Sequence, residues 1–286
     1  MPYHIRPYDN NNEAIVPMEN NWTPLVYFND IQLHAGESYT YNLATHESVC
    51  VVVHGTVDIS VGSNEWTGVG ERTYLWGGKP DAVYIPRGNK ATITAHQTGA
   101  EVFIAGGCSD PDEPADGRLP FRVSPGEVDT VQYGSDDTKT HRRIYHILGQ
   151  NVAGRTGNIL VSELFTVGAG GWSGFPPHKH HIERPGIESD HEEVFHYRFN
   201  PDHGFGAQFA YTGDDDFGPV YHVKHGSTIL LDRSYHPSVA APGYEMYYFT
   251  ILVGRHQRSL KQYFHPAHEY QVHTIPGLKD MIAKFK

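Results

Sequence analysis

Short apolar segments without a helical repeat are the feature that most restricts how this chain can fold. They are rich in β-branched and aromatic residues and are separated by Gly, Asn and Pro, a pattern typical of strands and tight turns. In the first half these segments are 37–43, 48–55, 56–62, 82–86, 91–96 and 101–106. In the second half they are 158–167, 193–199, 205–212, 218–223, 227–232 and 244–254. The pattern predicts an all-β protein.

One short helix is expected at the C-terminal end, after Pro276. Apolar residues recur there at helical spacing, at Leu278, Met281, Ile282 and Phe285. We expect this helix to pack its apolar side on a barrel or on a partner subunit.

The two halves of the chain share an internal spacing. Glu47 precedes a predicted strand and lies 39 residues before Pro86, which ends another strand. Glu193 likewise precedes a predicted strand and lies 39 residues before Asp232, which also ends a strand. Equal spacing of this kind indicates two similar β units, which we expect to be paired jelly-roll barrels.

Polar segments separate these two units. Residues 108–120 and 133–140 are rich in Asp, Pro and Gly, which is typical of connecting regions. We therefore expect an N-terminal barrel over residues 1–125 and a C-terminal barrel over residues 126–286.

Composition excludes several classes of function. The formal net charge is −11 with histidines neutral, so the chain lacks a broad basic surface for nucleic acid or anionic lipid. Two cysteines, Cys50 and Cys108, imply no disulfide framework and fit a reducing compartment. No basic stretch followed by an apolar core opens the sequence and no apolar run approaches about 20 residues, so we expect neither a signal peptide nor a membrane span. We expect a soluble, cytoplasmic protein.

The candidate site begins in the stretch FPPHKHHIERPGIESDHEEVF, residues 175–195. His178 and His180 are one residue apart, so both imidazoles share a face if this segment is extended. Glu193 opens the next strand on an otherwise aromatic face, where a lone buried carboxylate is costly unless it binds a cation. His236 begins a later strand.

Three imidazoles and one carboxylate suit a divalent first-row metal ion such as Zn, Mn, Fe or Ni. The alternative is a histidine-rich polar loop that binds nothing. In the first half no His-x-His precedes Glu47, and Lys90 stands where the repeat places His236. We therefore expect the N-terminal barrel to be free of metal and the C-terminal barrel to bind one ion.

The long spacer between His180 and Glu193, HIERPGIESDHE, is similar to that of the 5-deoxyglucuronate isomerase family of myo-inositol catabolism. This family belongs to the cupin superfamily and is related to 5-keto-4-deoxyuronate isomerase. The surrounding motifs also resemble it: GWSGFPPHKH, EEVFHYRFNPDHGFGAQ, SYHPSVAAPGYEMYYFTILVG, HRRIYHIL and the Glu47 segment.

The resemblance implies a bicupin, two jelly-roll barrels in one chain. It implies the conversion of 5-deoxy-D-glucuronate to 5-dehydro-2-deoxy-D-gluconate by aldose–ketose isomerisation. It also implies four metal ligands, His178, His180, Glu193 and His236. Proton transfer through an enediol and a hydride shift both give this product, and the sequence leaves both open.

Three positions depart from the family pattern. His181 stands where the family usually has Asp, and Phe209 where an Arg is common. Asp232, Arg233 and Ser234 replace a usual Pro-Arg-Gly turn. These changes leave the proposed ligands intact and alter the expected pocket wall, so they bear on the substrate.

Several residues are candidates for the catalytic base, with none preferred: Glu192, His191, Tyr235 and Tyr197. A substrate carboxylate requires a cation in the pocket. Arg233 is the first candidate, since Arg matches a carboxylate with two hydrogen bonds, and Lys179 is the second.

Tyr247 and Tyr248 are expected to line the barrel, with core packing favoured for at least one of them. Two other functions remain open: an iron-dependent cupin dioxygenase, and a sugar-binding cupin without catalysis. The exposed barrel faces and the C-terminal helix are also compatible with a homo-oligomer.

Overall fold

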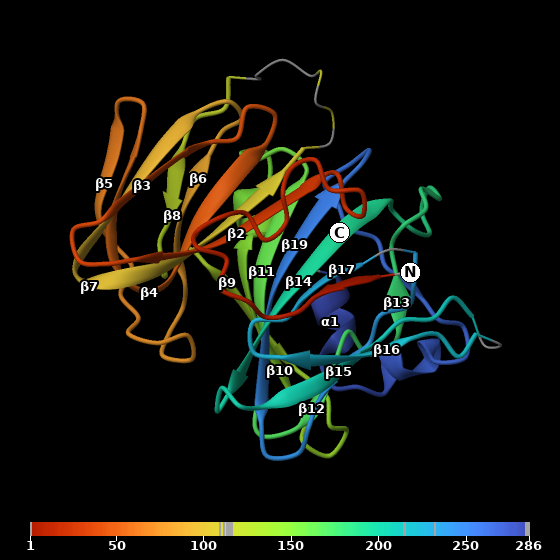
Figure 1. The fold of residues 1–286 in the computed structure, drawn as a ribbon. Coiled ribbons are helices and arrows are strands. Elements are labelled where there is room, and N and C mark those ends of the chain that lie inside the picture. The colour runs from red at the N-terminus through yellow and green to blue at the C-terminus, as the bar shows by residue number, and fades with distance from the viewer. Residues whose placement is uncertain are drawn as a thin grey trace.

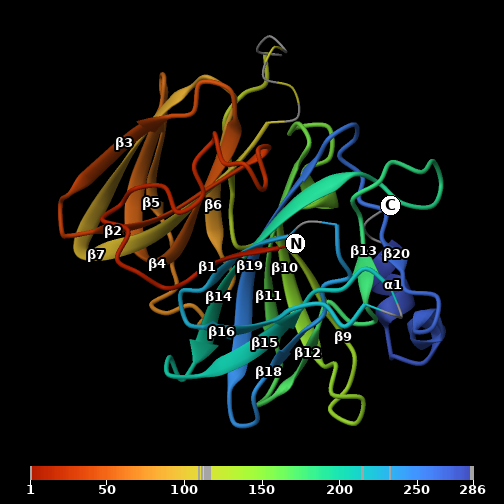
Figure 2. The ribbon, with the colours of Figure 1, turned by 45° about the vertical axis from the view of Figure 1, so that its right-hand side comes forward.

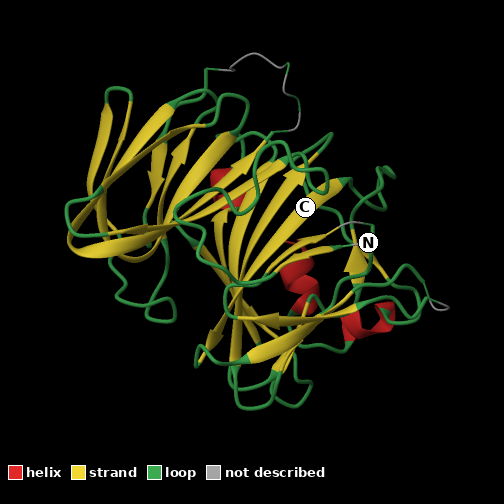
Figure 3. Cartoon of the chain, viewed as in Figure 1, coloured by secondary structure: helices red, strands yellow, loops and turns green. Residues whose placement is uncertain are grey.

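The fold is built almost entirely from antiparallel strands. The computed structural model describes residues 2–283 except 109, 111, 113–116, 214, 215 and 232. Figure 1 and Figure 3 show two strand-rich halves, one with the strands between residues 26 and 123 and the other with β1 and the strands of the later part of the chain, which also carries the helices. The predicted all-β class is confirmed. No helix in these ranges has the length and apolar composition needed to cross a bilayer.

The first half is one seven-stranded sheet that folds over itself. Its strands are β2 (Val26–Leu33), β3 (Ser38–Asn42), β4 (Glu47–Val61), β5 (Asn64–Val69), β6 (Asp81–Ile85), β7 (Lys90–Gly107) and β8 (Phe121–Val123). The main order is β2-β7-β4-β6-β8, with β3 on β7 and β5 on β4. The long strands β4 and β7 each unite two of the predicted strands.

A bulge allows these long strands to bend. The pairing of β4 with β7 shifts register on both sides of Gly55. Gly55 has a φ of +85°, and a Cβ there would lie 2.4 Å from the carbonyl oxygen of Gly99. Only glycine fits this position, and the bend turns the sheet into a barrel wall.

The second half contains another seven-stranded sheet, in the order β1-β17-β14-β19-β11-β10-β9. Its strands are β1 (Tyr3–Ile5), β9 (Asp129–Tyr133), β10 (Arg142–Leu148), β11 (Ile159–Thr166), β14 (His191–Asn200), β17 (Thr228–Leu231) and β19 (Glu245–Gly254).

Two smaller sheets complete this half. A four-stranded sheet has the order β12-β18-β15-β16, and a pair joins β13 to β20. Their bounds are β12 (Gly171–Ser173), β13 (His178–Lys179), β15 (Phe205–Phe209), β16 (Val220–Lys224), β18 (Ser238–Ala240) and β20 (Tyr263–Phe264). The helices are two 3₁₀ turns, η1 (Gln150–Val152) and η2 (Glu269–His273), and α1 (Leu278–Ala283).

The strand order repeats between the halves. The series β2-β7-β4-β6-β8 in the first sheet corresponds to β11-β19-β14-β17-β1 in the second. Glu47 begins β4 and Glu193 lies near the start of β14, so the two carboxylates occupy equivalent strands. Asp232, the end of the second spacing, lies outside the described residues.

One strand crosses the predicted domain boundary. β1, at residues 3–5, pairs with β17 and takes the place in the second sheet that β8 takes in the first. Figure 2 shows this N-terminal segment beside the strands of the second half. The division into 1–125 and 126–286 therefore needs correction at its start, and it otherwise stays a prediction.

The C-terminal helix packs on its own chain. Leu278 and Met281 are buried in an apolar cluster with residues of β9 and β10. The predicted helix is confirmed as far as Ala283, whereas Phe285 lies outside the described residues.

A continuous apolar core joins the two halves. Phe103 of the first sheet lies 5.2 Å from Phe249 of the second, measured between ring centroids. His196 is buried beside Phe28, with a ring distance of 4.9 Å. Arg72 donates to both carboxylate oxygens of Glu163 across this interface, at 2.8 and 2.6 Å.

We predict that Glu163→Gln lowers the free energy of unfolding by about 3 kcal/mol, because it leaves the buried Arg72 guanidinium without its counter-charge. Chemical denaturation of the variant and the wild type measures this change. The double variant Arg72→Met/Glu163→Leu removes both charges and should recover much of the loss. A single-variant cost below about 1 kcal/mol would contradict this view of the interface.

Candidate active site

Three histidines from separate segments converge on the open side of the second sheet. His178 lies in β13, His180 follows it, and His236 precedes β18. Their ligand nitrogens all lie within 4.8 Å of one another. The predicted grouping of these histidines is present in the structure.

Glu193 of β14 lies beside two of these histidines, His180 and His236. Its Oε2 is 3.0 Å from Nε2 of His180 and 3.4 Å from Nε2 of His236. Its Oε1 accepts a hydrogen bond from Thr250 Oγ1 at 2.7 Å. Burial alone would raise the pKa of Glu193, but the charge and hydrogen bond of His180 and the charge of His236 lower it below its ordinary value.

The long spacer after His180 folds back on itself so that Glu193 can reach the cluster. Arg184 and Glu188 form a backbone bridge at the turn, and the amide of His181 donates to Glu188 Oε1. The chain then returns so that the amide of His191 donates to the carbonyl of His180 at 2.9 Å. Glu193 follows two residues later, on the same face as the imidazoles.

The hydrogen bonds of the imidazoles fit a metal site. His178 Nδ1 lies 3.1 Å from the carbonyl oxygen of Pro176, and His236 Nδ1 lies 2.9 Å from that of Ser234. A carbonyl only accepts, so each Nδ1 carries the hydrogen and each Nε2 keeps its lone pair toward the cluster. These two imidazoles, together with His180 and Glu193, are a suitable donor set for a divalent first-row ion.

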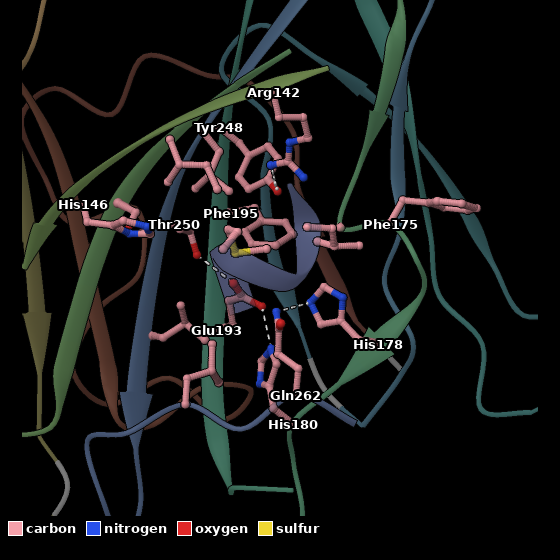
Figure 4. Close-up of a pocket in the computed structure, with 18 of the residues that line it drawn as sticks. Arg142, His146, Phe175, His178, His180, Glu193, Phe195, Tyr248, Thr250 and Gln262 are labelled. Carbon is pink, nitrogen blue, oxygen red and sulfur yellow. Dashed lines mark hydrogen bonds and ion pairs between the residues drawn. The ribbon is translucent and has the colours of Figure 1, made fainter. Parts of the chain in front are cut away.

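A cavity of about 60 Å³ adjoins the cluster. The residues drawn in Figure 4 come from the inner face of the large sheet, from the loops that carry the histidines and from α1. His178, His180 and Glu193 lie at one end and Arg142 at the other, with Tyr248 beside it. Gln262 closes the histidine end, where its Nε2 lies 2.8 Å from His178 Nε2.

The sheet floor of the cavity is built in rows across neighbouring strands. The row nearest Arg142 is apolar and aromatic, and consists of Ile144, Leu164 and Tyr248. The next row is more polar, and consists of His146, Ser162, Thr250 and Phe195. The last row contains Leu252 and Glu193. Polarity therefore changes along the strand direction.

Arg142 is buried in this cavity, with a side chain only 2% exposed. Its Nη1 donates to the hydroxyl of Tyr133 at 3.3 Å, and its Nη2 to that of Tyr248 at 3.0 Å. The hydroxyl of Tyr248 also makes a short hydrogen bond with Ser173. Arg142 thus forms a cationic end of the cavity, opposite Glu193.

The predicted catalytic bases lie outside the cavity. Glu192 points to the opposite face of β14, where it accepts from Arg255 at 2.6 Å and from the amide of Leu25 at 2.7 Å. Tyr197 donates its hydroxyl to Gln208 at 2.5 Å, and Tyr235 packs on His265. None of these three side chains is among the described residues that line the cavity, so we do not retain them as candidates for the base.

The other predicted base and the altered pocket residues also lie away from the lining. His191 Nε2 is 3.3 Å from the carbonyl oxygen of Arg258, and burial lowers its pKa to about 4. Phe209 stacks on Trp172. His181 pairs with Glu188 at 3.9 Å. The two departures His181 and Phe209 therefore change the surroundings of the cavity rather than its wall.

The predicted substrate-binding residues likewise face elsewhere. Arg233 is exposed to solvent, and Lys179 lies over the rings of Tyr235 and Tyr263 at 5.3 and 5.6 Å. Tyr247 is fully buried and donates to Glu163 at 3.1 Å in the core between the halves. Tyr248, in contrast, lines the cavity. Of the two tyrosines, Tyr247 is therefore the one that packs in the core.

Sequence reasoning missed Arg142 and His146. Each lies two residues from Ile144 along β10, one before it and one after it. Because alternate residues of a strand share a face, all three face the cavity. The alternation of the segment RRIYHIL was the available signal.

We predict that the protein binds one divalent ion per chain and that His236→Ala weakens this binding at least 100-fold, since even residues that only orient metal ligands contribute 10- to 100-fold. Elemental analysis after dialysis against a competing chelator measures the amount of metal bound per chain. His203→Ala, which removes an exposed imidazole, is the matched control. Equal metal content in both variants would contradict the assignment.

Comparison with known proteins places the chain among sugar-acid isomerases. Residues 4–271 match the model of the KduI/IolB family. The 5-deoxy-glucuronate isomerase of Geobacillus kaustophilus is 30% identical over 94% of both chains. That of Bacillus subtilis strain 168 is 29% identical over 89% of this chain and 90% of its own.

Solved structures agree with this placement. An IolB-like protein from Salmonella typhimurium superimposes with a TM-score of 0.80 and 28% identity, over 90% of this chain and 94% of its own. Bacillus subtilis oxalate decarboxylase matches with a TM-score of 0.58 and 11% identity, over 84% and 71%, which shows a shared cupin fold. The chain is a two-barrel cupin that belongs to the KduI/IolB family.

Proposed function

We propose that this protein is a metal-dependent aldose–ketose isomerase that converts 5-deoxy-D-glucuronate to 5-dehydro-2-deoxy-D-gluconate in myo-inositol catabolism. One observation carries the proposal. Three histidines and Glu193 converge at the end of a cavity in a chain that is 30% identical to a 5-deoxy-glucuronate isomerase. The cytoplasmic location and the homo-oligomer stay predictions.

The reaction moves hydrogen between two neighbouring carbons and needs no co-reactant. The C2 hydroxyl becomes a ketone and the C1 aldehyde becomes a hydroxymethyl group, so atoms and electrons balance within the substrate. A divalent metal held by His178, His180, Glu193 and His236 would supply Lewis acidity that polarises the oxygens of these carbons. The metal could be Zn, Mn, Fe or Ni.

The surrounding residues hold this donor set in position. Thr250 binds Oε1 of Glu193 and so directs Oε2 toward the imidazoles. Gln208 is fully buried and donates to the carbonyl of His236 at 2.8 Å, which fixes the loop that carries this ligand. These contacts limit the freedom of the ligands before a metal or substrate arrives.

We propose His146 as the base in place of the four earlier candidates. Among the described residues that line the cavity, it is the imidazole outside the metal cluster. Its Nδ1 lies 2.8 Å from the hydroxyl of Ser162, which orients the ring. A neutral imidazole has a ring nitrogen with a lone pair, so it can accept the C2 proton and return it at C1.

The proposed function is tested by turnover of 5-deoxy-D-glucuronate with metal-loaded protein, followed by NMR. We expect conversion that a chelator abolishes. Glu193→Gln should lower kcat/KM at least 1,000-fold, because it removes the one anionic ligand. Its neighbour Glu192→Gln, on the opposite face, should stay near the wild type. Oxygen uptake by the Fe(II) form without any isomerisation would contradict the proposal and favour a dioxygenase.

The role of His146 is tested separately. His146→Gln keeps a polar side chain near Ser162 but cannot carry the proton, so kcat should fall about 100-fold or more while KM changes little. Turnover in heavy water should place deuterium on the carbon that was C1. Tyr235→Phe, away from the cavity, is the control. Full activity of His146→Gln with no deuterium in the product would instead indicate a hydride shift.

A further inference from the structure

We propose that Arg142 binds the carboxylate of the substrate and so determines the direction in which the sugar acid lies in the cavity. This inference rests on the proposed function and adds a residue that decides substrate class. It replaces Arg233, whose exposed side chain lies outside the lining.

The first support is the contrast between Arg142 and the other buried arginines. Three arginine side chains among the described residues are less than a tenth exposed. Arg72 forms an ion pair with both carboxylate oxygens of Glu163. Arg198 forms ion pairs with Asp30 at 2.6 Å and with Glu101 at 2.8 Å. Arg142 has only phenol hydroxyls, which carry no charge at neutral pH.

A buried guanidinium without an anion is costly, because removing the ion from water is offset only by a counter-charge and full hydrogen bonding. The Nε of Arg142 is buried and has no hydrogen-bond partner. The cavity adjoins the Arg142 residue that carries this unpaired donor. A planar anion with two oxygens matches the fork of donors on arginine.

The second support is the position of Arg142 relative to the metal cluster. The substrate carries its aldehyde at C1 and its carboxylate at C6, at opposite ends of one chain. The cavity has His178, His180 and Glu193 of the cluster at one end and Arg142 at the other. With the carboxylate on Arg142, C1 and C2 lie toward Glu193 and the row that contains His146.

This orientation of the substrate also explains why C5 carries no hydroxyl group. The carbon next to the carboxylate, C5, then lies over the row formed by Ile144 and Leu164. Ile144 and Leu164 offer no hydrogen bond, and the hydroxyl of Tyr248 in the same row already bonds Arg142 and Ser173. A hydroxyl at C5 would therefore be buried without a partner, whereas a methylene packs there.

The test compares two substrates and three variants. The substrates are 5-deoxy-D-glucuronate and 5-deoxy-D-glucose, which differ only in carboxylate against hydroxymethyl at C6. For the acid, Arg142→Met should lower kcat/KM about 100-fold or more, since losing one partner of a buried charge pair has effects of this size. For the neutral sugar it should change kcat/KM less than about 3-fold. The preference for the acid then disappears.

Two further variants separate binding from folding. Arg142→Lys keeps a charge but loses the fork, so it should retain only part of the preference and remain folded even if the methionine variant unfolds. Arg143→Met is the matched control. Arg143 points to the other face of β10, over the rings of Tyr145 and Phe165. Metal content and thermal unfolding are measured for all of them.

Binding of the C1-reduced acid, measured by calorimetry, tests Arg142 independently of turnover. If the wild type binds this acid and Arg142→Met weakens it about 100-fold, the inference stands even where no isomerisation occurs, and only the proposed function fails. If the wild type isomerises the acid while Arg142→Met and Arg142→Lys keep its full affinity and preference, the inference is overturned and the proposed function stands.

Discussion

The burial of one carboxylate, that of Glu193, is the constraint on which the rest of the site depends. It projects from a central strand of the second sheet and is only 5% exposed, beside aromatic and aliphatic neighbours. Such a group is tolerated only with compensating charge and hydrogen bonds. Thr250 supplies one hydrogen bond, and three imidazoles arrive from segments outside the sheet. The folded-back spacer and the tethered loop before β18 serve to bring these imidazoles to the carboxylate.

The cavity extends this arrangement in one direction. Its floor passes from Glu193 through a polar row to an apolar row, and ends at the buried cation of Arg142. A sugar acid has the complementary order, from its carbonyl and hydroxyl groups to a methylene and a carboxylate. The first half of the chain packs on the outer face of this sheet, where Arg72 and Glu163 join the two sheets. The site therefore needs the rigidity of both halves but takes its described polar groups from one.

Much of this could be predicted from local patterns. Alternation placed His178 and His180 on one face, and equal spacing placed Glu193 on the strand equivalent to that of Glu47. What sequence could not provide is the pairing between distant strands. β1 joins the second sheet through residues more than 200 positions away. Arg142 and Arg233 are both arginines beside turns, and only the pairing of β10 with β11 buries one while the other stays in solvent.

The most direct test of this account is anomalous diffraction from crystals of the metal-loaded protein, recorded on both sides of the absorption edge of the metal. The account predicts one strong peak per chain, within about 2.0–2.2 Å of the Nε2 atoms of the three histidines and of Oε2 of Glu193. A peak elsewhere, or none at this cluster under conditions that give full activity, would contradict it.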